Sequence, residues 1–341
     1  GRRGGGAMGA PPLVSVAIVT HDSAADLPAC CAALAALDHR PLELVVADCA
    51  SGDGSAALAE RLGRELPFPA RTVRLPENRG FAGGMNAALG VTSGAWVLSL
   101  NPDAQVTPEY VSRLLAAAAR SPWRPVGALT GRLVRPAPEG EAPRLDACGM
   151  RLRPTWRHLD RGSGERDRGQ LRRPARVFGA TGAASLWRRA ALDDVALDGE
   201  IFDPRFHSYR EDAELCFRLR ERGWEIVYEP GAVALHRRHN LPARRRAMAA
   251  AINHHSLKNR YLLRLYHQTP GNLLTTLLPA LWRDALALAY VLGFERQSLG
   301  AYAWLWRHRR ELWRRRRAIR ERRTVPARAL ERWFWREADE G

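Results

Sequence analysis

The stretch Leu98-Ser99-Leu100-Asn101-Pro102-Asp103 decides the fold of this chain. It extends the apolar run 95–97, and an apolar segment of this length between turn residues is typical of a buried strand. Pro102 ends the strand, so Asp103 is expected at the carboxyl end, where ligands bind in open α/β sheets. There it either binds a divalent cation next to a diphosphate or is a turn residue capping a helix expected over 109–120.

Strands and helices alternate along the first hundred residues. Strands are expected over 14–20, 42–47, 72–75 and 95–100, and helices over 24–37 and after Ser55. Such alternation predicts βαβ units and a parallel sheet. The polar segments 20–23, 48–55 and 101–103 each follow a strand, so we expect them to lie along one edge of that sheet.

A glycine-rich segment, 77–86, precedes the strand at 95–100. Its glycines permit close backbone approach, and a helix beginning near Gly84 would offer amide groups to an anionic ligand. The segment has neither the Walker nor the Rossmann spacing. It therefore predicts an anion-binding loop without identifying the ligand.

Composition limits the class of protein. The chain has 341 residues, 46% of them hydrophobic, and a formal net charge of +17, so it is globular and its partner is expected to be anionic. Five scattered cysteines without a CxxC pair argue against a disulfide framework and a zinc site and fit a reducing compartment. Residues 1–12 are expected to be a disordered leader without a secretory signal, and 137–176 a long loop of the kind that forms lids.

Further charged groups follow in the second half of the chain. Glu211 and Asp212 occupy the first turn of an expected amphipathic helix, where acids also complement the helix dipole. His236 follows a strand and precedes Arg237 and Arg238. It is either a structural histidine or a metal ligand, and the arginines could steady a diphosphate.

Six motifs occur in the order seen in family 2 glycosyltransferases. They are Thr20-His21-Asp22, Asp48-x-x-Ser51-x-Asp53-Gly54-Ser55, Asn78-x-Gly80-Phe81-Ala82-Gly83-Gly84-x-Asn86, Asn101-Pro102-Asp103, Glu211-Asp212-Ala213-Glu214-Leu215-Cys216-x-Arg218 and His236. Residues 13–240 resemble most the bacterial rhamnosyltransferase-like branch of that family.

The resemblance implies an α/β GT-A fold, Rossmann-like, with a mostly parallel sheet flanked by helices, over a catalytic domain 13–256. It implies an inverting transfer of a sugar, with rhamnose as first choice, from a dTDP- or UDP-sugar donor to a hydroxyl of a cell-envelope glycan or lipid-linked acceptor. Asp103 would bind Mn²⁺ or Mg²⁺ with His236 as a further ligand, and Asp212 would be the catalytic base, with Glu211 as the alternative. The implied nucleotide-binding residues are Thr20, Asp22, Asp48, Ser51, Asp53, Asn78, Gly80, Gly83, Asn86 and Asn101.

The chemistry of sugar transfer agrees with these roles. A carboxylate can activate the attacking hydroxyl by general base catalysis. A divalent cation can neutralise the charge that develops on the leaving diphosphate. With one base and direct displacement, the anomeric configuration inverts.

The region 257–341 is expected to be helical, basic and rich in tryptophan. Its apolar segments 273–281 and 285–294 are divided by Arg283-Asp284, so neither is expected to span a membrane. Over 301–323, leucine and tryptophan occupy one helix side and arginine the other. This pattern is typical of a helix lying on anionic lipid, which would place the protein in the cytoplasm on the inner face of the membrane. Alternatively, the helix packs on the catalytic domain with a solvated basic face.

Two other classes of protein remain as alternatives. A nucleotidyltransferase of similar fold would be expected to carry a basic loop after its first strand, and 20–26 contains no lysine or arginine. A basic nucleic-acid-binding protein would explain the arginine content. The excess arginine lies in the tail and in 151–176, away from the acidic strand ends, so no nucleic-acid partner is expected.

Overall fold

The computed structural model describes residues 10–137, 141–238 and 250–340. Most of the expected leader, residues 1–9, lies outside the described residues. The main sheet has ten strands, with the path β10-β12-β6-β11-β4-β1-β2-β3 and with β5 and β7 paired to β12 and β6. A separate hairpin of β8 and β9 covers part of it. The expected α/β class is confirmed.

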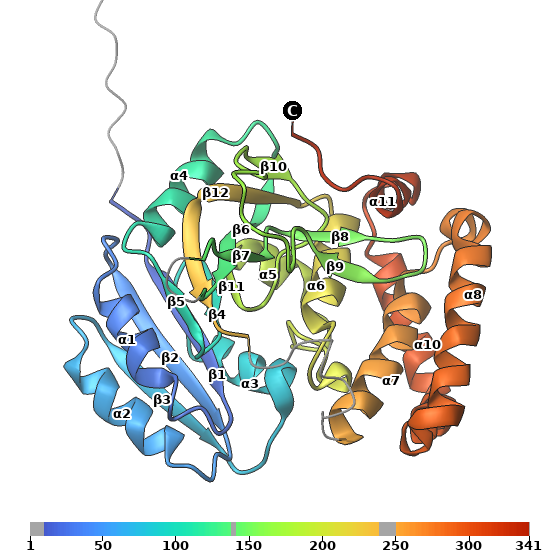
Figure 1. Cartoon of the computed structure of the whole chain (residues 1–341), viewed down its shortest axis with the longest axis horizontal. Coiled ribbons are helices and arrows are strands. Elements are labelled where there is room, and N and C mark those ends of the chain that lie inside the picture. The colour runs from blue at the N-terminus through green and yellow to red at the C-terminus, as the bar shows by residue number, and fades with distance from the viewer. Residues whose placement is uncertain (1–9, 138–140, 239–249, 341) are drawn as a thin grey trace, which may run out of the picture.

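One half of the sheet is parallel and follows the expected βαβ order. Its strands are β1 (Val14–Thr20), β2 (Leu42–Cys49), β3 (Ala70–Leu75) and β4 (Trp96–Leu100). The helices between them are α1 (Leu27–Ala35), α2 (Ser55–Glu65) and α3 (Gly80–Leu89). In Figure 1, α1 and α2 lie on the outer side of this half. The helix expected near Gly84 begins four residues earlier, at Gly80.

Glycines in α3 bring this helix close to its neighbours. Gly80 has φ +64°, and a Cβ there would lie 2.4 Å from the carbonyl oxygen of His207. A Cβ at Gly84 would lie 2.5 Å from the Val19 side chain and 2.9 Å from Cys49 Sγ. These glycines therefore allow close contact within the protein, where we had expected close approach to a ligand.

The other half of the sheet mixes parallel and antiparallel strands. Its strands are β5 (Ala104–Val106), β6 (Val126–Arg135), β7 (Arg144–Ala147), β10 (Ala175–Arg176), β11 (Ala184–Arg188) and β12 (Glu225–His236). The helices beside it are α4 (Tyr110–Arg120), α5 (Arg189–Val195) and α6 (Glu211–Glu221). β11 runs antiparallel between β4 and β6, whereas β6 and β12 are parallel.

The expectation of a long loop over 137–176 is wrong for its described part. That segment contains β7, β10 and the hairpin of β8 (Met150–Leu152) and β9 (His158–Asp160). Trp156, in the turn of the hairpin, is almost fully buried, and its indole Nε1 donates to Thr276 Oγ1 at 3.0 Å. The segment is therefore an ordered layer packed against the C-terminal helices.

The C-terminal region forms helices on the side of the molecule away from α1 and α2 (Figure 1). They are α7 (Ala250–His267), α8 (Pro270–Phe294), α9 (Gly300–Arg307), α10 (Arg309–Glu321) and α11 (Arg328–Glu331). Arg283 and Asp284 divide the apolar residues but not the helix, because α8 runs through them as one helix of 25 residues. Asp284 forms ion pairs with Arg260 and Arg264 of α7. By length and composition α8 could cross a membrane, which corrects the expectation for 273–294.

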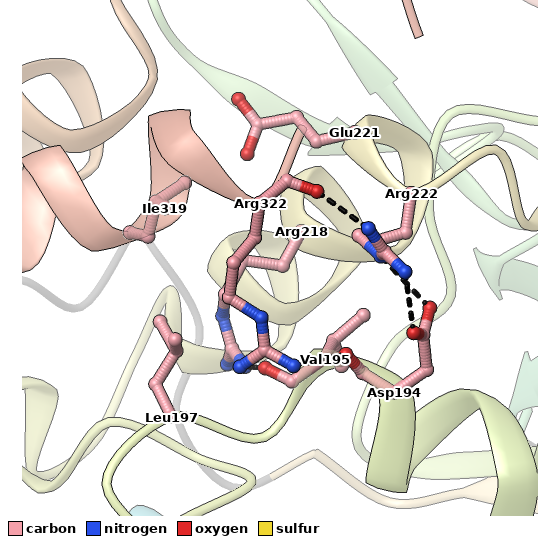
Figure 2. A pocket seen from close by; sticks show the side chains of 8 residues that line it. All are labelled: Asp194, Val195, Leu197, Arg218, Glu221, Arg222, Ile319 and Arg322. Atoms are coloured by element: carbon pink, nitrogen blue, oxygen red, sulfur yellow. Dashed lines mark hydrogen bonds and ion pairs between the residues drawn. The ribbon is translucent and has the colours of Figure 1, made fainter. Parts of the chain in front are cut away.

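The helix α10 turns its apolar side inward. Leu312 and Ile319 are buried in the same hydrophobic cluster as the side chains of α6 and β11. Arg322, which follows α10, donates to the backbone carbonyl of Asp194 at 2.8 Å, and Arg222 donates to the carbonyl of Arg322 at 2.6 Å (Figure 2). The cavity among these residues has about 10 Å³, room for at most one water molecule. Over 309–323, Leu312 and Ile319 therefore pack inside the protein and do not face lipid as expected, whereas Trp313 is 57% exposed.

Candidate active site

Two buried oxygen atoms without a protein partner mark the carboxyl ends of β1 and β2. Thr20 and Asp48 are register partners in these strands. Within the described part of the chain, neither Thr20 Oγ1 nor Asp48 Oδ1 has a hydrogen-bond partner, although both residues are buried. Asp48 Oδ2 accepts from the amide of Ser51 at 3.1 Å. Buried polar groups are normally satisfied, so these two atoms are available to a ligand.

The predicted residues Asp22, Ser51 and Asp53 join the two loops that follow β1 and β2. Asp22 Oδ1 accepts from the amide of Gly52 at 2.7 Å, and Ser51 Oγ accepts from the amide of Asp22 at 3.0 Å. Asp53 accepts from the amide of Ala24 and, with its other oxygen, from Ser55. The bonds to Ser55 and Ala24 lower the pKa of Asp53. These residues shape the rim around Asp48.

The glycine-rich segment presents Asn78 and Gly80 near β2. Asn78 Oδ1 accepts from the amide of Gly80 at 2.8 Å. Gly83 packs against the side chain of Arg79. Asn86, which was expected to bind the nucleotide, instead binds the protein backbone. Its side-chain amide forms two hydrogen bonds, of 2.7 and 2.9 Å, with the backbone of Phe202.

Asp103 faces His236 across the ends of β4 and β12. Asp103 Oδ1 lies 3.3 Å from His236 Nε2, and the Asn101 amide nitrogen lies 3.5 Å from the same ring atom. Both side chains of the Asp103–His236 pair are largely buried. Asp103 thus faces His236, and no side chain caps α4, so the helix-capping alternative is not supported.

Asp146, in β7, is a site residue that the sequence did not reveal. Its Oδ2 lies 2.7 Å from His236 Nδ1, so the imidazole sits between two carboxylates. Burial alone would lower the pKa of His236, but its bonds to Asp103 and Asp146 raise it to about 9. The only signal for Asp146 was the short apolar alternation of Leu145 and Ala147, within a segment that otherwise resembled a loop.

The two arginines expected at the diphosphate have protein partners. Arg238 pairs with Asp146 at 3.1 Å and with Asp160 of β9 at 2.9 Å. Arg237 is half exposed and lies 3.5 Å from Asp26. Arg238 therefore connects β7 with the hairpin, and of the two only Arg237 is exposed enough to reach a ligand.

Asp212 lies in the first turn of α6 and points toward the loop before β11. Its Oδ2 accepts from the amide of Gly182 at 3.1 Å, and its Oδ1 accepts from the amide of Ala213 at 2.8 Å. The neighbouring residue Ala183 accepts from the amide of Asn101 at 2.8 Å. Asp212 and the Asn101–Asp103 turn are therefore joined through two adjacent residues, on one edge of the sheet.

The two acids of α6 differ in environment. Burial, opposed by the bond from Gly182 and reinforced by the charge of Asp160, raises the pKa of Asp212 to about 6. Burial and the charge of Asp212 raise the pKa of Glu211 well above its usual value, and Glu211 Oε2 has no partner. Near neutral pH, Asp212 is thus ionised and is the better base of the two.

A loop with unusual backbone geometry leads into α6. His207, Tyr209 and Arg210 all have positive φ angles between 62° and 74°. Asn259 of α7 is fully buried, and its Nδ2 lies 2.7–2.9 Å from the carbonyl oxygens of three loop residues, Phe206, Ser208 and Tyr209. Asn259 is a second residue that sequence reasoning missed, because nothing in α7 points to a partner 50 residues away.

The donor set fits a divalent cation. Among the residues the structure describes, no group of three or more histidine, cysteine or acidic side chains could enclose a metal ion. Asp103 and His236 would supply one carboxylate oxygen and, after the ring has released the proton that its raised pKa favours, one imidazole nitrogen, with Asp146 orienting the ring from behind, as is usual for metal-bound histidines. Two protein ligands leave coordination positions for diphosphate oxygens and water, as is common for Mg²⁺ and Mn²⁺ sites.

This fold is the GT-A fold, as comparison with solved structures confirms. A mannosyltransferase from Pyrobaculum calidifontis, in complex with GDP-Man and Mn²⁺, superposes with a TM-score of 0.54 at 18% identity, covering 95% of this chain and 88% of that one. TarS of S. aureus (residues 1–349) in complex with UDP-GlcNAc superposes with a TM-score of 0.52 at 15% identity, covering 84% and 79%. At these identities the likeness concerns the fold alone.

The chain belongs to glycosyltransferase family 2. The family described as "Glycosyl transferase family 2" matches residues 15–196. An N-acetylglucosaminyl-diphospho-decaprenol L-rhamnosyltransferase of Mycobacterium tuberculosis is 31% identical over 265 residues, which cover 72% of this chain and 82% of the relative. An N-acetylglucosaminyltransferase of Sinorhizobium fredii is 28% identical over 231 residues, covering 66% and 53%. The protein is thus a glycosyltransferase, similar to the rhamnosyltransferase branch, and the nucleotidyltransferase and nucleic-acid-binding alternatives are set aside.

Proposed function

We propose that this protein catalyses the inverting, divalent-cation-dependent transfer of a sugar, rhamnose as first choice, from a dTDP- or UDP-sugar. The acceptor is a hydroxyl of a cell-envelope glycan or of a lipid-linked sugar. The observation that carries the proposal is the connection of Asp212 to the Asp103–His236 pair through Gly182, Ala183 and Asn101. The name of the mycobacterial relative supports the choice of sugar and of a lipid-linked acceptor.

Asp48, Thr20 and the backbone around Asn78 bind the nucleoside. The two oxygens without partners, Thr20 Oγ1 and Asp48 Oδ1, support this assignment. Asp22, Ser51 and Asp53 hold the loops around them, as their mutual hydrogen bonds suggest. Arg237 reaches the diphosphate.

Asp103 and His236 hold Mn²⁺ or Mg²⁺, which when bound offsets the negative charge of the leaving diphosphate. Asp146 keeps the His236 ring oriented, with Nε2 toward Asp103. Asn101 lies beside the same nitrogen and limits the positions that the ring can adopt.

Asp212 removes the proton of the acceptor hydroxyl as that oxygen attacks the anomeric carbon. The amides of Gly182 and Ala213 fix the carboxylate, and its raised pKa makes it a stronger base than an exposed aspartate. Glu211 is buried, and burial and the charge of Asp212 raise its pKa well above the usual value, which favours its protonated form. A single base and one displacement give inversion at the anomeric carbon.

Nucleotide binding tests this proposal directly. Thermal-shift titrations with UDP and dTDP, each with and without Mn²⁺ or Mg²⁺, should show stabilisation that depends on the cation. In Asp103→Ala the dependence on the cation should be lost. Stabilisation by neither nucleotide, or equal stabilisation without metal, would contradict the proposal.

The setting of the reaction follows from the acceptor. A lipid-linked acceptor brings the enzyme to a membrane surface, and the basic C-terminal region favours an anionic one. The protein then works in the cytoplasm, attached to the inner face of the cell membrane.

A further inference from the structure

The helix α8 exposes an apolar stripe along its whole length. Three of its exposed side chains are Leu274 (79% exposed), Leu278 (77%) and Trp282 (67%). Leu281, Leu288 and Leu292 continue the stripe at helical spacing. Helical geometry places no charged residue in this row, and α8 is about 37 Å long. Monomeric soluble proteins rarely expose an apolar surface of this extent.

The opposite side of α8 is bound to the folded body. Asn272, Thr276, Ala280 and Val291 are buried. Thr276 accepts from Trp156 of the hairpin, and Asp284 pairs with Arg260 and Arg264 of α7 at 2.6 Å each. If α8 crossed a bilayer, Arg260 and Arg264 of α7 would either enter the hydrocarbon with α8 or lose their ion pairs with Asp284. Each of these outcomes costs free energy. These contacts therefore hold α8 along the surface of the folded body, with its apolar stripe facing outward.

The charges near α8 point to an anionic occupant of this surface. Residues 270–323 contain twelve arginines and four acidic residues. Asp284, Glu311 and Glu321 form ion pairs with arginines, and Glu295 is buried. Arg296 lies at the C-terminal end of the stripe, where its Nε donates to the carbonyl of Leu292. An apolar stripe on a chain of formal net charge +17, with Arg296 at one end of the stripe, matches an anionic lipid surface.

We infer that the α8 stripe is a membrane-docking surface that lies in the plane of an anionic bilayer, with its leucines and Trp282 among the lipids. Of the C-terminal helices, α8 therefore supplies the apolar stripe, while α9 and α10 contribute exposed arginines and the exposed Trp306 and Trp313. The choice of a lipid partner rests on the proposed lipid-linked acceptor. The geometry of the stripe is observed independently of that proposal.

Vesicle flotation tests the inference with the full chain. The wild-type protein should float with vesicles of phosphatidylcholine and phosphatidylglycerol and less with phosphatidylcholine alone. Leu274→Glu/Leu278→Glu should lower binding by about tenfold or more, because each leucine then fails to enter the lipid. The control Ala57→Glu/Ala119→Glu adds the same charge at exposed positions of α2 and α4 and should bind like the wild type. Both positions of the test variant are exposed, so folding should be retained.

Depth and orientation are tested separately. Leu278→Cys labelled with an environment-sensitive dye should report a less polar environment with anionic vesicles, and the five native cysteines are buried and should not react. Alkaline carbonate should release the protein from vesicles. Resistance to carbonate would show a spanning helix and would overturn the inference. A wild-type protein that does not float and forms a dimer, with the dimer lost in Leu274→Glu/Leu278→Glu, would show that a second copy covers the stripe and would also overturn it. Cation-dependent UDP or dTDP binding, measured on the same preparations, separates this failure from failure of the proposed function.

Discussion

At the scale of single residues, Asp212 is a partly buried carboxylate in the first turn of α6. Its pKa is raised to about 6 and its two oxygens are fixed by backbone amides. The base must be ionised, so the rate should rise with pH through about 6 and level off above it. The protonated carboxyl dominates below that value, and the rate should then fall about tenfold per pH unit.

Asp212→Asn should lower kcat by about 10²–10⁴-fold and abolish this acidic limb. The folded carboxyl binds protons more tightly than the unfolded one, so ionisation of Asp212 reduces stability as pH rises above about 4. The variant should therefore unfold at the same or a higher temperature at pH 7.5. Transfer assays between pH 5 and 8 check the loss of activity and of its pH dependence, and calorimetry at pH 7.5 checks the unfolding temperature. Unchanged transfer by Asp212→Asn would remove this residue as the base.

Asp146 should matter for the cation through His236, while its ion pairs with Arg135 and Arg238 also stabilise the fold. Asp146→Asn keeps the shape but removes the charge behind His236, and loss of such an orienting carboxylate costs about 10–100-fold in metal affinity. Mn²⁺ titration in the presence of UDP, followed by electron paramagnetic resonance, measures this without reference to activity. Asp160→Asn is the matched control, because Asp160 also binds Arg238 but not His236. Equal Mn²⁺ affinity in the wild type and Asp146→Asn would contradict the role.

At the scale of elements, α7 fixes the loop that carries Asp212 to its position. Asn259→Ala removes the donor that lies against three carbonyl oxygens, which should cost about 1–3 kcal/mol and let the positive-φ residues relax. We expect kcat to fall by at least about tenfold, with a smaller change in UDP affinity. Stopped-flow transfer and nucleotide titration separate the two effects.

Thr276→Val is the comparison for that variant. It removes a buried hydrogen bond of α8, to Trp156, at a place remote in sequence from the loop. It should reduce stability without changing kcat at a temperature where the protein is folded. If both variants lower kcat in proportion to their loss of stability, Asn259 is a structural residue and does not position the base.

The elements that could be predicted are those whose own residues determine them. The four parallel strands and their helices follow from apolar runs between turn residues, and the order of motifs identified the family. β6 was missed because Gly127, Gly131 and Arg132 interrupt its apolar run; Gly131 is required there because a Cβ would collide with Ala232 and Tyr110. The strand expected before His236 is β12, which contains Pro230 and Gly231 and has an irregular register against β6 at that point.

Tertiary contacts decided the remaining cases. Arg283-Asp284 divides two apolar segments in the sequence, but one helix contains both, and Asp284 is neutralised by two arginines of α7. Asp103 and Asp48 could be placed on one edge from their strand ends alone. Asp146 could not be placed there from the sequence, because strands of three or four residues show too little periodicity to be recognised.

At the scale of the whole molecule, the catalytic and C-terminal parts share one core. Trp333 and Phe334 of the C-terminal region belong to the same hydrophobic cluster as Phe178 and Phe217. The rings of Phe334 and Trp156 lie 4.8 Å apart, and the guanidinium of Arg220 lies 4.4 Å above Trp333. Backbone bonds of 2.7 and 2.9 Å join Arg176 of β10 to Asp339. We propose that 257–341 folds together with the catalytic residues.

Removal of this shared packing should destabilise the whole protein. Trp333→Ala leaves a cavity in the common core and should lower the free energy of unfolding by about 3–5 kcal/mol. Trp335→Ala, two residues further on at a position that is 61% exposed, should change it by no more than about 0.5 kcal/mol. Urea unfolding followed by circular dichroism measures the free energy of unfolding of both variants.

A chain ending at residue 256 should fail to fold, because α6 and the 150–160 hairpin would lose the C-terminal residues that pack against them. A monodisperse product of that length that still binds UDP with Mn²⁺ would instead establish 13–256 as an independent domain.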